Sequence, residues 1–251
     1  MSWYVMAHHP SPEGLGFNWL HDTRCVYTEQ DLVLYAKGRT ATMRFFTADL
    51  HLGDKAIARW RGFGDDVSAH DEAILAGLVG RLSADDELWL LGDICKARVE
   101  DVQGLREAIP CERVYVVVGN HDARSKFVTC GGFQKVDYYD QIGRVRTDGY
   151  KFVMSHYPML DWDRAYHGSF MLHGHIHSLP VEPGGDVAPL DAHAGGMGMR
   201  GYNVWNAKHG VRRYDVGVDA NGYYPVSAEE ILAAMPSDAE WSAMHHGLKV
   251  D

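Results

Sequence analysis

The sequence has few cysteines and no long apolar run. Its four cysteines, Cys25, Cys95, Cys111 and Cys130, lie far apart, and none forms the Cys-x-x-Cys spacing of a zinc knuckle or a redox pair. A disulfide framework is not indicated either, so we expect a reducing, cytoplasmic environment. No stretch has the length of a transmembrane helix, and the first residues lack the basic leader and apolar core of a signal peptide. We therefore expect no membrane partner.

Positive charge is also scarce. The chain has 24 Lys and Arg residues against 34 Asp and Glu residues, which gives a formal net charge of -10. Because the phosphates of DNA and RNA are repelled by an acidic protein, nucleic acid is a less favoured partner than a small molecule. Bound metal ions would offset this charge locally, so a small phosphate ester, including a nucleotide, is compatible with the composition.

No linker rich in Gly, Ser or Pro interrupts the region that carries the motifs below. We therefore expect one catalytic domain over residues 43–235. Residues 1–42 carry no recognisable chemistry, and Met43 directly precedes the first motif strand, so we interpret this segment as an N-terminal extension of uncertain structure or an over-extended start. Residues 236–251 are expected to form a polar C-terminal tail.

Five apolar runs in the chain each end in residues that can bind a metal ion. The clearest run, Val114 to Val118, has no polar alternation, which is typical of a parallel strand covered on both faces. It continues into Gly119-Asn120-His121-Asp122. In open α/β sheets ligands bind outside the carboxyl ends of such strands, so these ends predict the site. The other runs end at Asp49-Leu-His51, Gly92-Asp93, His156 and His173-Gly-His175-Ile-His177.

Helical patterns alternate with these runs. Apolar residues recur at helical spacing over about 66–82, and a second helix is predicted over 99–109, before Pro110. This alternation indicates βαβ units and a parallel sheet. The remaining predicted elements are short strands at 136–139 and 151–154, a hairpin turn at Thr147-Asp-Gly149, a final strand at 214–218, and a helix through Met235 that begins at the capping box Ser227-Ala-Glu-Glu230.

The motifs Asp-x-His, Gly-Asp, Gly-Asn-His-Asp, a lone His and Gly-His-x-His follow in this order between residues 43 and 177. In this order they resemble the calcineurin-like metallophosphoesterase superfamily. The resemblance implies an α/β fold, a four-layer α/β/β/α sandwich, and a dinuclear metal-dependent phosphoesterase activity. Ser155-His-Tyr-Pro158 and Asp215-Val-Gly-Val-Asp219 also look like compact bacterial or phage members of the superfamily.

The resemblance also implies a set of metal ligands. Mixed nitrogen and oxygen ligands suit two divalent ions of Mn, Fe or Zn. Coordination lowers the pKa of bound water to about 7 in known zinc sites, so hydroxide is available at neutral pH. In the family this hydroxide, shared by the two metals, would attack phosphorus. By this resemblance the first metal would be held by Asp49, His51 and His177, the second by Asn120, His156 and His175, and Asp93 would bridge them.

His121 and Asp122 are the implied catalytic residues. His121 matches the family position beside the substrate, where it would stabilise or protonate the leaving-group oxygen. Asp122 could accept the other ring proton of His121 and fix its tautomer. We expect His173 to be packed or to support a ligand, and we expect His70 and His167 to be ordinary helix or loop residues.

Other polar residues near these motifs have two open interpretations. Lys96 stands where the family often has a second Asp after Gly-Asp. Residues 178–200 form a loop-like stretch, which is either a lid near the site or a plain connection. For the cations we favour solvated surface positions over substrate contacts. These are Lys96, Arg98, Arg124, Lys126, and the turn Arg59-Trp60-Arg61 with its packed Trp.

Several functions stay open at this point. Hydrolysis of a phosphodiester is favoured, but a phosphomonoesterase would use the same metal core. A non-catalytic metal-binding scaffold of the same fold is less favoured, because the chain keeps every expected ligand position. A redox or hydrolytic enzyme with one metal is weaker, since Asp93, Asn120 and His156 would then lack a shared role.

Overall fold

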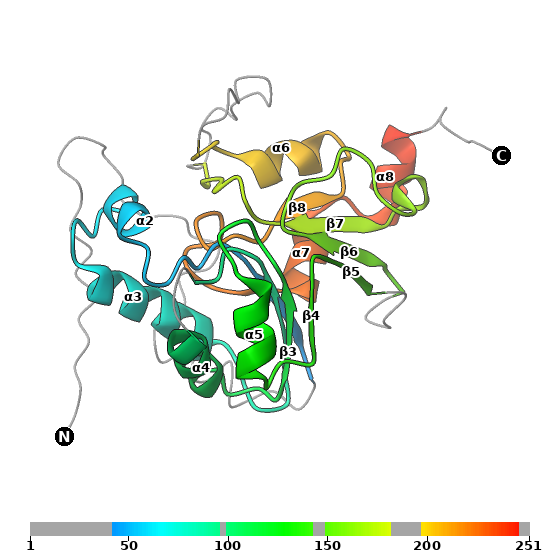
Figure 1. Cartoon of the computed structure of the whole chain (residues 1–251). Helices are drawn as coiled ribbons and strands as arrows, with labels where there is room; N and C mark the ends of the chain where they lie inside the picture. The colour runs from blue at the N-terminus through cyan, green and yellow to red at the C-terminus, as the bar shows by residue number, and fades with distance from the viewer. Residues whose placement is uncertain (1–41, 96–98, 143–148, 182–196, 246–251) are drawn as a thin grey trace.

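The structure is a computed structural model that describes residues 42–95, 99–142, 149–181 and 197–245. It contains a five-stranded sheet with the order β4-β3-β2-β1-β9 and a four-stranded sheet with the order β5-β6-β7-β8 (Figure 1). In the first sheet β1 to β4 are parallel and β9 pairs antiparallel with β1. Its strands are β1 (Arg44–Thr47), β2 (Glu87–Leu91), β3 (Arg113–Val117), β4 (Lys135–Asp137) and β9 (Val226–Ser227).

The second sheet is also mainly parallel. Strands β6, β7 and β8 run parallel, and β5 pairs antiparallel with β6. A single parallel bridge joins Ala48, directly after β1, to Gly217, shortly after β8. The carboxyl ends of the two sheets therefore meet. The strands are β5 (Tyr139–Ile142), β6 (Phe152–Ser155), β7 (Phe170–His173) and β8 (Arg213–Asp215).

Consecutive strand residues fill two different cores, because side chains alternate across a sheet. Phe45 packs with Ile74 and Leu78 in the core under the outer helices. Phe46 packs between the sheets, where its ring centroid lies 5.5 Å from that of Phe152. The first sheet is thus buried on both faces, as its apolar runs predict. The helices over its outer core are α3 (Val67–Gly80), α4 (Val99–Ala108) and α5 (Arg124–Cys130).

Helix α6 (Tyr202–Lys208) packs on β8 at the far side of the second sheet, which completes the predicted four-layer α/β/β/α sandwich (Figure 1). The predicted capping box is confirmed: the Ser227 hydroxyl and the Glu230 side chain cap α7 (Ala228–Ala234). The two remaining short helices in the described part of the chain before α7 are α2 (Lys55–Trp60) and the 3-10 helix η1 (Ala165–His167).

The C-terminal segment, expected to be a polar tail, is helical in part. It contains α8 (Asp238–Met244), which begins at a second capping box formed by Ser237 and Glu240. Arg212 holds this helix, because its Nη2 lies 2.6 Å from Asp238 Oδ1 and its guanidinium lies 5.1 Å from the Trp241 ring centroid. The Ser-x-x-Glu signal that predicts α7 is repeated here, so the same rule would have predicted α8.

Some sequence predictions lie outside the described residues. These are the structure of residues 1–41, Lys96 and Arg98, the turn at Thr147-Asp148, and the middle of the 178–200 loop. The proposed domain boundaries therefore stay predictions. Among the helices in the described ranges, none has both the length and the apolar character needed to cross a membrane.

Candidate metal centre

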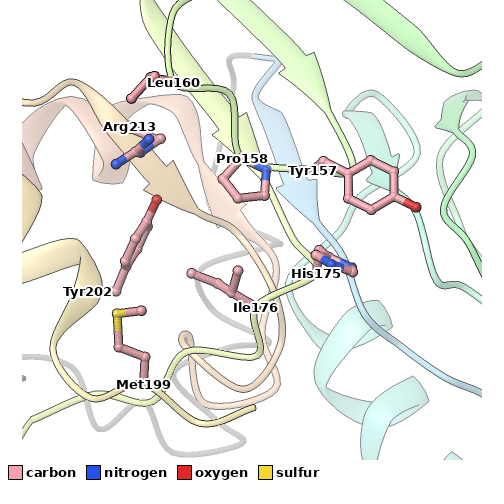
Figure 2. A pocket seen from close by; sticks show the side chains of 8 residues that line it. All are labelled: Tyr157, Pro158, Leu160, His175, Ile176, Met199, Tyr202 and Arg213. Atoms are coloured by element: carbon pink, nitrogen blue, oxygen red, sulfur yellow. The ribbon is translucent and has the colours of Figure 1, made fainter. Parts of the chain in front are cut away.

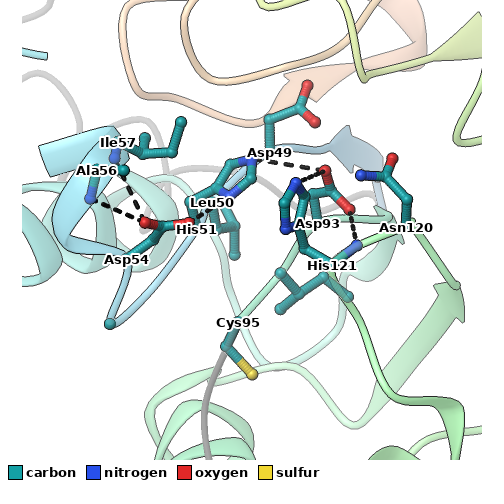
Figure 3. A network of polar contacts seen from close by, with 12 residues as sticks. Asp49, Leu50, His51, Asp54, Ala56, Ile57, Asp93, Cys95, Asn120 and His121 are labelled. Atoms are coloured by element: carbon teal, nitrogen blue, oxygen red, sulfur yellow. Dashed lines mark hydrogen bonds and ion pairs between the residues drawn. The ribbon is translucent and has the colours of Figure 1, made fainter. Parts of the chain in front are cut away.

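Residues that can bind metal gather where the carboxyl ends of the two sheets meet. Asp49 and His51 follow β1, Asp93 follows β2, and Asn120 follows β3. His156 follows β6 and the pair His175 and His177 follows β7. Figure 3 shows Asp49, His51, Asp93 and Asn120 with their side chains around one space. All seven residues of the predicted ligand set therefore come together in this structure.

These residues form two adjoining groups. In the first, ligand atoms of Asp49, His51 and His177 lie within 4.8 Å of one another, and in the second the same holds for Asp93, His156 and His175. Asn120 joins the second group, since its Oδ1 lies 3.0 Å from His156 Nε2.

Asp93 lies between the two groups. Its Oδ2 is 3.6 Å from Nε2 of His51 in the first group and 3.3 Å from Nε2 of His156 in the second. Its other oxygen, Oδ1, accepts a hydrogen bond of 2.8 Å from the backbone N–H of His121. One carboxylate oxygen is therefore shared between the groups, which is the position of a bridging ligand.

The partners of two histidines decide which ring nitrogen faces the centre. His156 Nδ1 lies 3.0 Å from the carbonyl oxygen of Leu91, which can only accept a hydrogen bond. His177 Nδ1 lies 2.8 Å from Asp219 Oδ2. In both rings Nδ1 therefore carries a proton, and Nε2 is the nitrogen that faces the centre and would bind a cation in place of its own proton. Nε2 of His177 lies 3.2 Å from Nε2 of His51, so a cation between these rings could be bound by both nitrogens.

The backbone at these positions is unusual. Asp49, His51, Asp93, His175 and His177 have φ angles of 59°, 51°, 52°, 76° and 45°. Only two other described non-glycine residues, Arg164 and Tyr223, have positive φ. Each such conformation costs about 1–3 kcal/mol and persists only where the surroundings impose it, and these conformations concentrate at functional sites. The backbone strain of the described chain is therefore gathered at the predicted ligands.

Burial perturbs the titration of the first group. Burial raises the pKa of Asp49 to about 7, although nearby histidines oppose the shift. Burial and the charge of His177 lower the pKa of His51 to about 3. A divalent cation would favour both the ionised carboxylate and the neutral imidazole, so the donor chemistry of this group fits a metal ion.

In the second group Asp93 and His156 shift each other. Burial alone would raise the pKa of Asp93, but contacts with His156 and with the His121 backbone lower it to about 2. Burial alone would lower the pKa of His156, but the contacts with Asp93 and the charge of Asp49 raise it to about 9. The carboxylate is therefore ionised at neutral pH and is ready to bind a cation in place of the imidazole proton.

Comparison with known proteins agrees with this geometry. Residues 46–199 match the calcineurin-like phosphoesterase superfamily domain, which is more than half of the chain. The chain belongs to the calcineurin-like phosphoesterase superfamily. The Gene 66 protein of Mycobacterium phage L5 is 26% identical to it over 161 residues, which cover 53% of this chain and 77% of the phage protein.

Two solved structures are similar to this chain. The protein of unknown function AQ665 from Aquifex aeolicus aligns with a TM-score of 0.53 and 21% identity, over 76% of this chain and 98% of that one. This likeness supports the fold. The nuclease MPE from Pseudomonas putida aligns with a TM-score of 0.36 and 26% identity, over 56% of this chain and 64% of that one.

Arg61 supports the ligand groups, which corrects its interpretation as a solvated cation. Its side chain is 1% exposed, and its Nε and Nη2 donate to the two carboxylate oxygens of Asp219 at 2.8 and 2.6 Å. The same guanidinium donates to the carbonyl oxygens of Asp49 and Leu50 at 2.7 and 3.1 Å. Arg61 therefore links the first ligand loop to Asp219, which in turn orients His177. Arg59, in contrast, is exposed and pairs with Asp65.

Asp219 is the site residue that sequence reasoning missed. It lies four residues after β8, in Asp215-Val-Gly-Val-Asp219. The rule that polar residues after buried strands build the site would have selected it, because β8 is parallel to β7 in the same sheet. Trp60 is also near this place, since its ring centroid lies 5.7 Å from that of His177 and its side chain is partly exposed.

In the described part of the chain, two other histidines are buried outside the ligand groups. His70 is buried, with Nε2 2.9 Å from Arg61 Nη1 and Nδ1 2.7 Å from Asp71 Oδ1, so it is not the ordinary helix residue that we expected. His173 is packed, as one of its two interpretations predicted: its Nε2 lies 3.1 Å from the Tyr202 hydroxyl. His167 is exposed in η1.

His121 lies at the open side of the centre. Contrary to the expectation from the sequence, the Asp122 carboxylate does not contact the His121 ring. The His121 side chain is 42% exposed, and its Nε2 lies 4.0 Å from Asp93 Oδ2. The Asp122 carboxylate instead accepts backbone hydrogen bonds of 2.9 Å from both Ile94 and Gly119. Asp122 therefore joins the loop after β2 to the turn after β3, and it does not fix the tautomer of His121.

Replacement of Gly119 by alanine should damage the centre. A Cβ at Gly119 would lie 2.3 Å from both the backbone nitrogen and Oδ1 of Asp93, so the Asp93 loop would have to move. We expect Gly119→Ala to destabilise the protein by about 1–3 kcal/mol, and to weaken Mn²⁺ binding in isothermal titration calorimetry. The matched control is Gly104→Ala inside α4, where the new methyl group meets open space. It should stabilise the fold by about 0.5–1 kcal/mol. Equal metal affinity in both variants would contradict the role of Gly119.

Proposed function

We propose that this protein is a dinuclear metal-dependent phosphoesterase that hydrolyses a phosphodiester. The observation that carries the proposal is the shared carboxylate oxygen of Asp93 between the two ligand groups. Two ions of Mn, Fe or Zn, when bound, would neutralise the phosphoryl oxygens and activate a water molecule. Asp49, His51 and His177 would hold one ion, Asn120, His156 and His175 would hold the other, and Asp93 would hold both.

The protein side chains would orient this centre and handle the proton of the leaving group. His156 and His177 are fixed by Leu91 O and Asp219, so they present Nε2 without rearrangement. His121 is the exposed histidine beside Asp93. It is therefore the group placed to hold a proton at Nε2 and donate it to the oxygen that leaves phosphorus.

A diester is favoured over a monoester because of the surroundings of His175. A diester carries a second organic substituent, and a mainly apolar pocket opens next to His175. A monoester would bring an additional negative charge and would leave this pocket without an occupant. A small substrate also agrees better with the net charge of -10 than a nucleic acid does. The free thiols of Cys95, Cys111 and Cys130 agree with the cytoplasmic environment that we propose.

The first test compares Mn²⁺-dependent hydrolysis of bis-p-nitrophenyl phosphate with that of p-nitrophenyl phosphate. We expect a preference for the diester of at least about tenfold in kcat/KM, because the second substituent has a place to bind. Faster hydrolysis of the monoester would contradict the phosphodiesterase proposal and would indicate a phosphomonoesterase. Failure to bind Mn²⁺, together with failure to hydrolyse either ester, would favour the non-catalytic scaffold.

The role of His121 depends on the leaving group, which gives a second test. p-Nitrophenolate leaves without a proton, whereas an alkoxide needs one. We expect His121→Ala to lower kcat by about 100-fold for an alkyl leaving group and by less for p-nitrophenolate. His167→Ala, an exposed histidine in η1, is the control and should change neither rate. An equal loss with both leaving groups would show that His121 acts on binding or folding instead.

A further inference from the structure

A pocket of about 440 Å³ adjoins the second ligand group (Figure 2). His175 and Tyr157 lie at one end of it, and Arg213 and Leu160 lie at the other. Its walls include apolar and aromatic side chains, among them Ile176, Met199 and Tyr202. The volume falls in the usual range of small-molecule pockets, about 300–1,000 Å³.

The pocket is continuous with the proposed reaction centre. The Tyr157 ring centroid lies 4.6 Å from that of His175 and 5.1 Å from that of His156. A phosphate held at the second ligand group would therefore have one of its substituents directed along Tyr157 into the pocket.

Arg213 gives the far end of the pocket a specific chemistry. Its Nη1 donates to the carbonyl oxygen of Met159 at 2.9 Å, and its guanidinium lies 5.6 Å from the Tyr202 ring centroid. Its Nε is buried, so only the terminal nitrogens of the guanidinium can meet an occupant of the pocket. Among the described lining residues there is no carboxylate. The half-buried guanidinium lines the pocket, so its terminal N–H groups can donate to an occupant that carries hydrogen-bond acceptors.

We propose that this pocket binds the nucleoside of a nucleotide phosphodiester, an inference that rests on the proposed phosphodiesterase function. A nucleobase has flat apolar faces that suit Tyr157, Tyr202 and Ile176, and its edge carries carbonyl or ring-nitrogen acceptors for Arg213. An acyl chain would desolvate Arg213 without a hydrogen bond. A sugar alone would leave the apolar walls unmatched. A nucleobase satisfies both parts of the pocket.

The experiment compares two diesters with the same leaving group, thymidine 5′-(p-nitrophenyl) phosphate and methyl p-nitrophenyl phosphate, with the Mn²⁺-loaded protein. Both release p-nitrophenolate, so the difference in kcat/KM reports the nucleoside alone. We expect the thymidine ester to be preferred by at least about fivefold, the lower limit for stacking of one base. Arg213→Met should abolish that preference.

A second pair of variants avoids any effect on folding. Leu160 is 95% exposed at the pocket rim, next to the Met159 carbonyl that Arg213 binds. Leu160→Asp places a competing carboxylate beside the guanidinium, whereas Leu160→Asn has the same shape without the charge. We expect the aspartate variant to lose most of the thymidine preference and the asparagine variant to keep most of it. Arg59→Met, at an exposed ion pair outside the pocket, should behave like the unmodified protein.

The outcomes separate this inference from the proposed function. Hydrolysis of both diesters with equal kcat/KM would overturn the nucleoside pocket and leave the phosphodiesterase intact. A thymidine preference that survives both Arg213→Met and Leu160→Asp would also overturn it. Turnover of neither diester would contradict the phosphodiesterase function itself. In that case, calorimetry of thymidine 5′-monophosphate with the Mn²⁺-loaded protein tests whether the pocket binds a nucleoside. Binding that is about tenfold weaker in Arg213→Met would support the nucleoside pocket, and absence of binding would overturn it.

Discussion

Asp93→Asn should abolish the activity with little change in the fold. The asparagine has the same shape, and its oxygen can still accept the hydrogen bond from the His121 backbone that Asp93 Oδ1 accepts. Its amide nitrogen would replace Oδ2, the atom that lies between His51 and His156. An NH₂ group carries two protons and no lone pair for a cation. Both ligand groups would therefore lose their shared oxygen at once.

We expect Asp93→Asn to lower kcat on bis-p-nitrophenyl phosphate by at least about 1,000-fold, since the charge stabilisation supplied by metals amounts to several kcal/mol. Mn²⁺ affinity, measured by calorimetry on protein stripped with a chelator, should fall by more than about 100-fold. Asp85→Asn, at an exposed loop position, is the matched control and should change neither quantity. Metal affinity that is unchanged in Asp93→Asn would show that the two groups do not share this residue.

The sequence predicts the site well because the ligands follow buried strands. A single glycine separates the apolar run from the ligand after Val118 and Leu91, and the ligand follows Ser155 directly, so the position of each ligand is a local property of the chain. Parallel pairing then brings the ligand-bearing strand ends of each sheet to one edge of that sheet. The alternation of Phe45 and Phe46 between two cores follows from the same strand geometry.

The parts that sequence reasoning missed depend on contacts distant in the chain. Arg61 looks like a surface cation until Asp219, 158 positions later, is placed against it. Asp122 looks like a partner for the adjacent His121, but the tight turn after β3 directs its carboxylate to Ile94 and Gly119. Neither fact can be derived from residue spacing, because each depends on how two loops cross. Helix α8 is different, since its capping signal is local and could have been recognised.

The positive φ angles also explain why the ligand loops need support. Asp49 and His51 both lie in the left-handed region, and their N–H groups bond to Gly92 O and Asp93 O at 2.9 Å each. The first two ligand loops are therefore joined through their backbones. Arg61 adds two further bonds, to the carbonyl oxygens of Asp49 and Leu50. A strained loop that is held in this way keeps its ligands in place before a metal binds.

Removal of Arg61 should therefore cause the largest loss of stability. Arg61→Met would leave the buried carboxylate of Asp219 without its cation and would leave two loop carbonyls without a donor. Breaking one partner of a buried ion pair typically costs about 3–5 kcal/mol. Urea unfolding of the chelated protein at about pH 7 measures this loss in the free energy of unfolding. Arg59→Met is the control, and because its pair with Asp65 is exposed we expect no measurable change.

The dependence on pH tests the same ion pair independently. Burial would raise the pKa of Asp219, but Arg61 and His177 lower it below its usual value. A carboxylate with a lowered folded pKa stabilises the protein above its unfolded pKa of about 3.9, and this contribution is lost as the pH falls through the folded pKa. The difference in the free energy of unfolding between the unmodified protein and Arg61→Met should therefore be largest near neutral pH and should decrease below about pH 4. The double variant Arg61→Met/Asp219→Asn removes the unpaired charge and should recover part of the loss. A gap that is constant with pH and unrelieved in the double variant would show that Arg61 stabilises the protein by packing rather than through its charge.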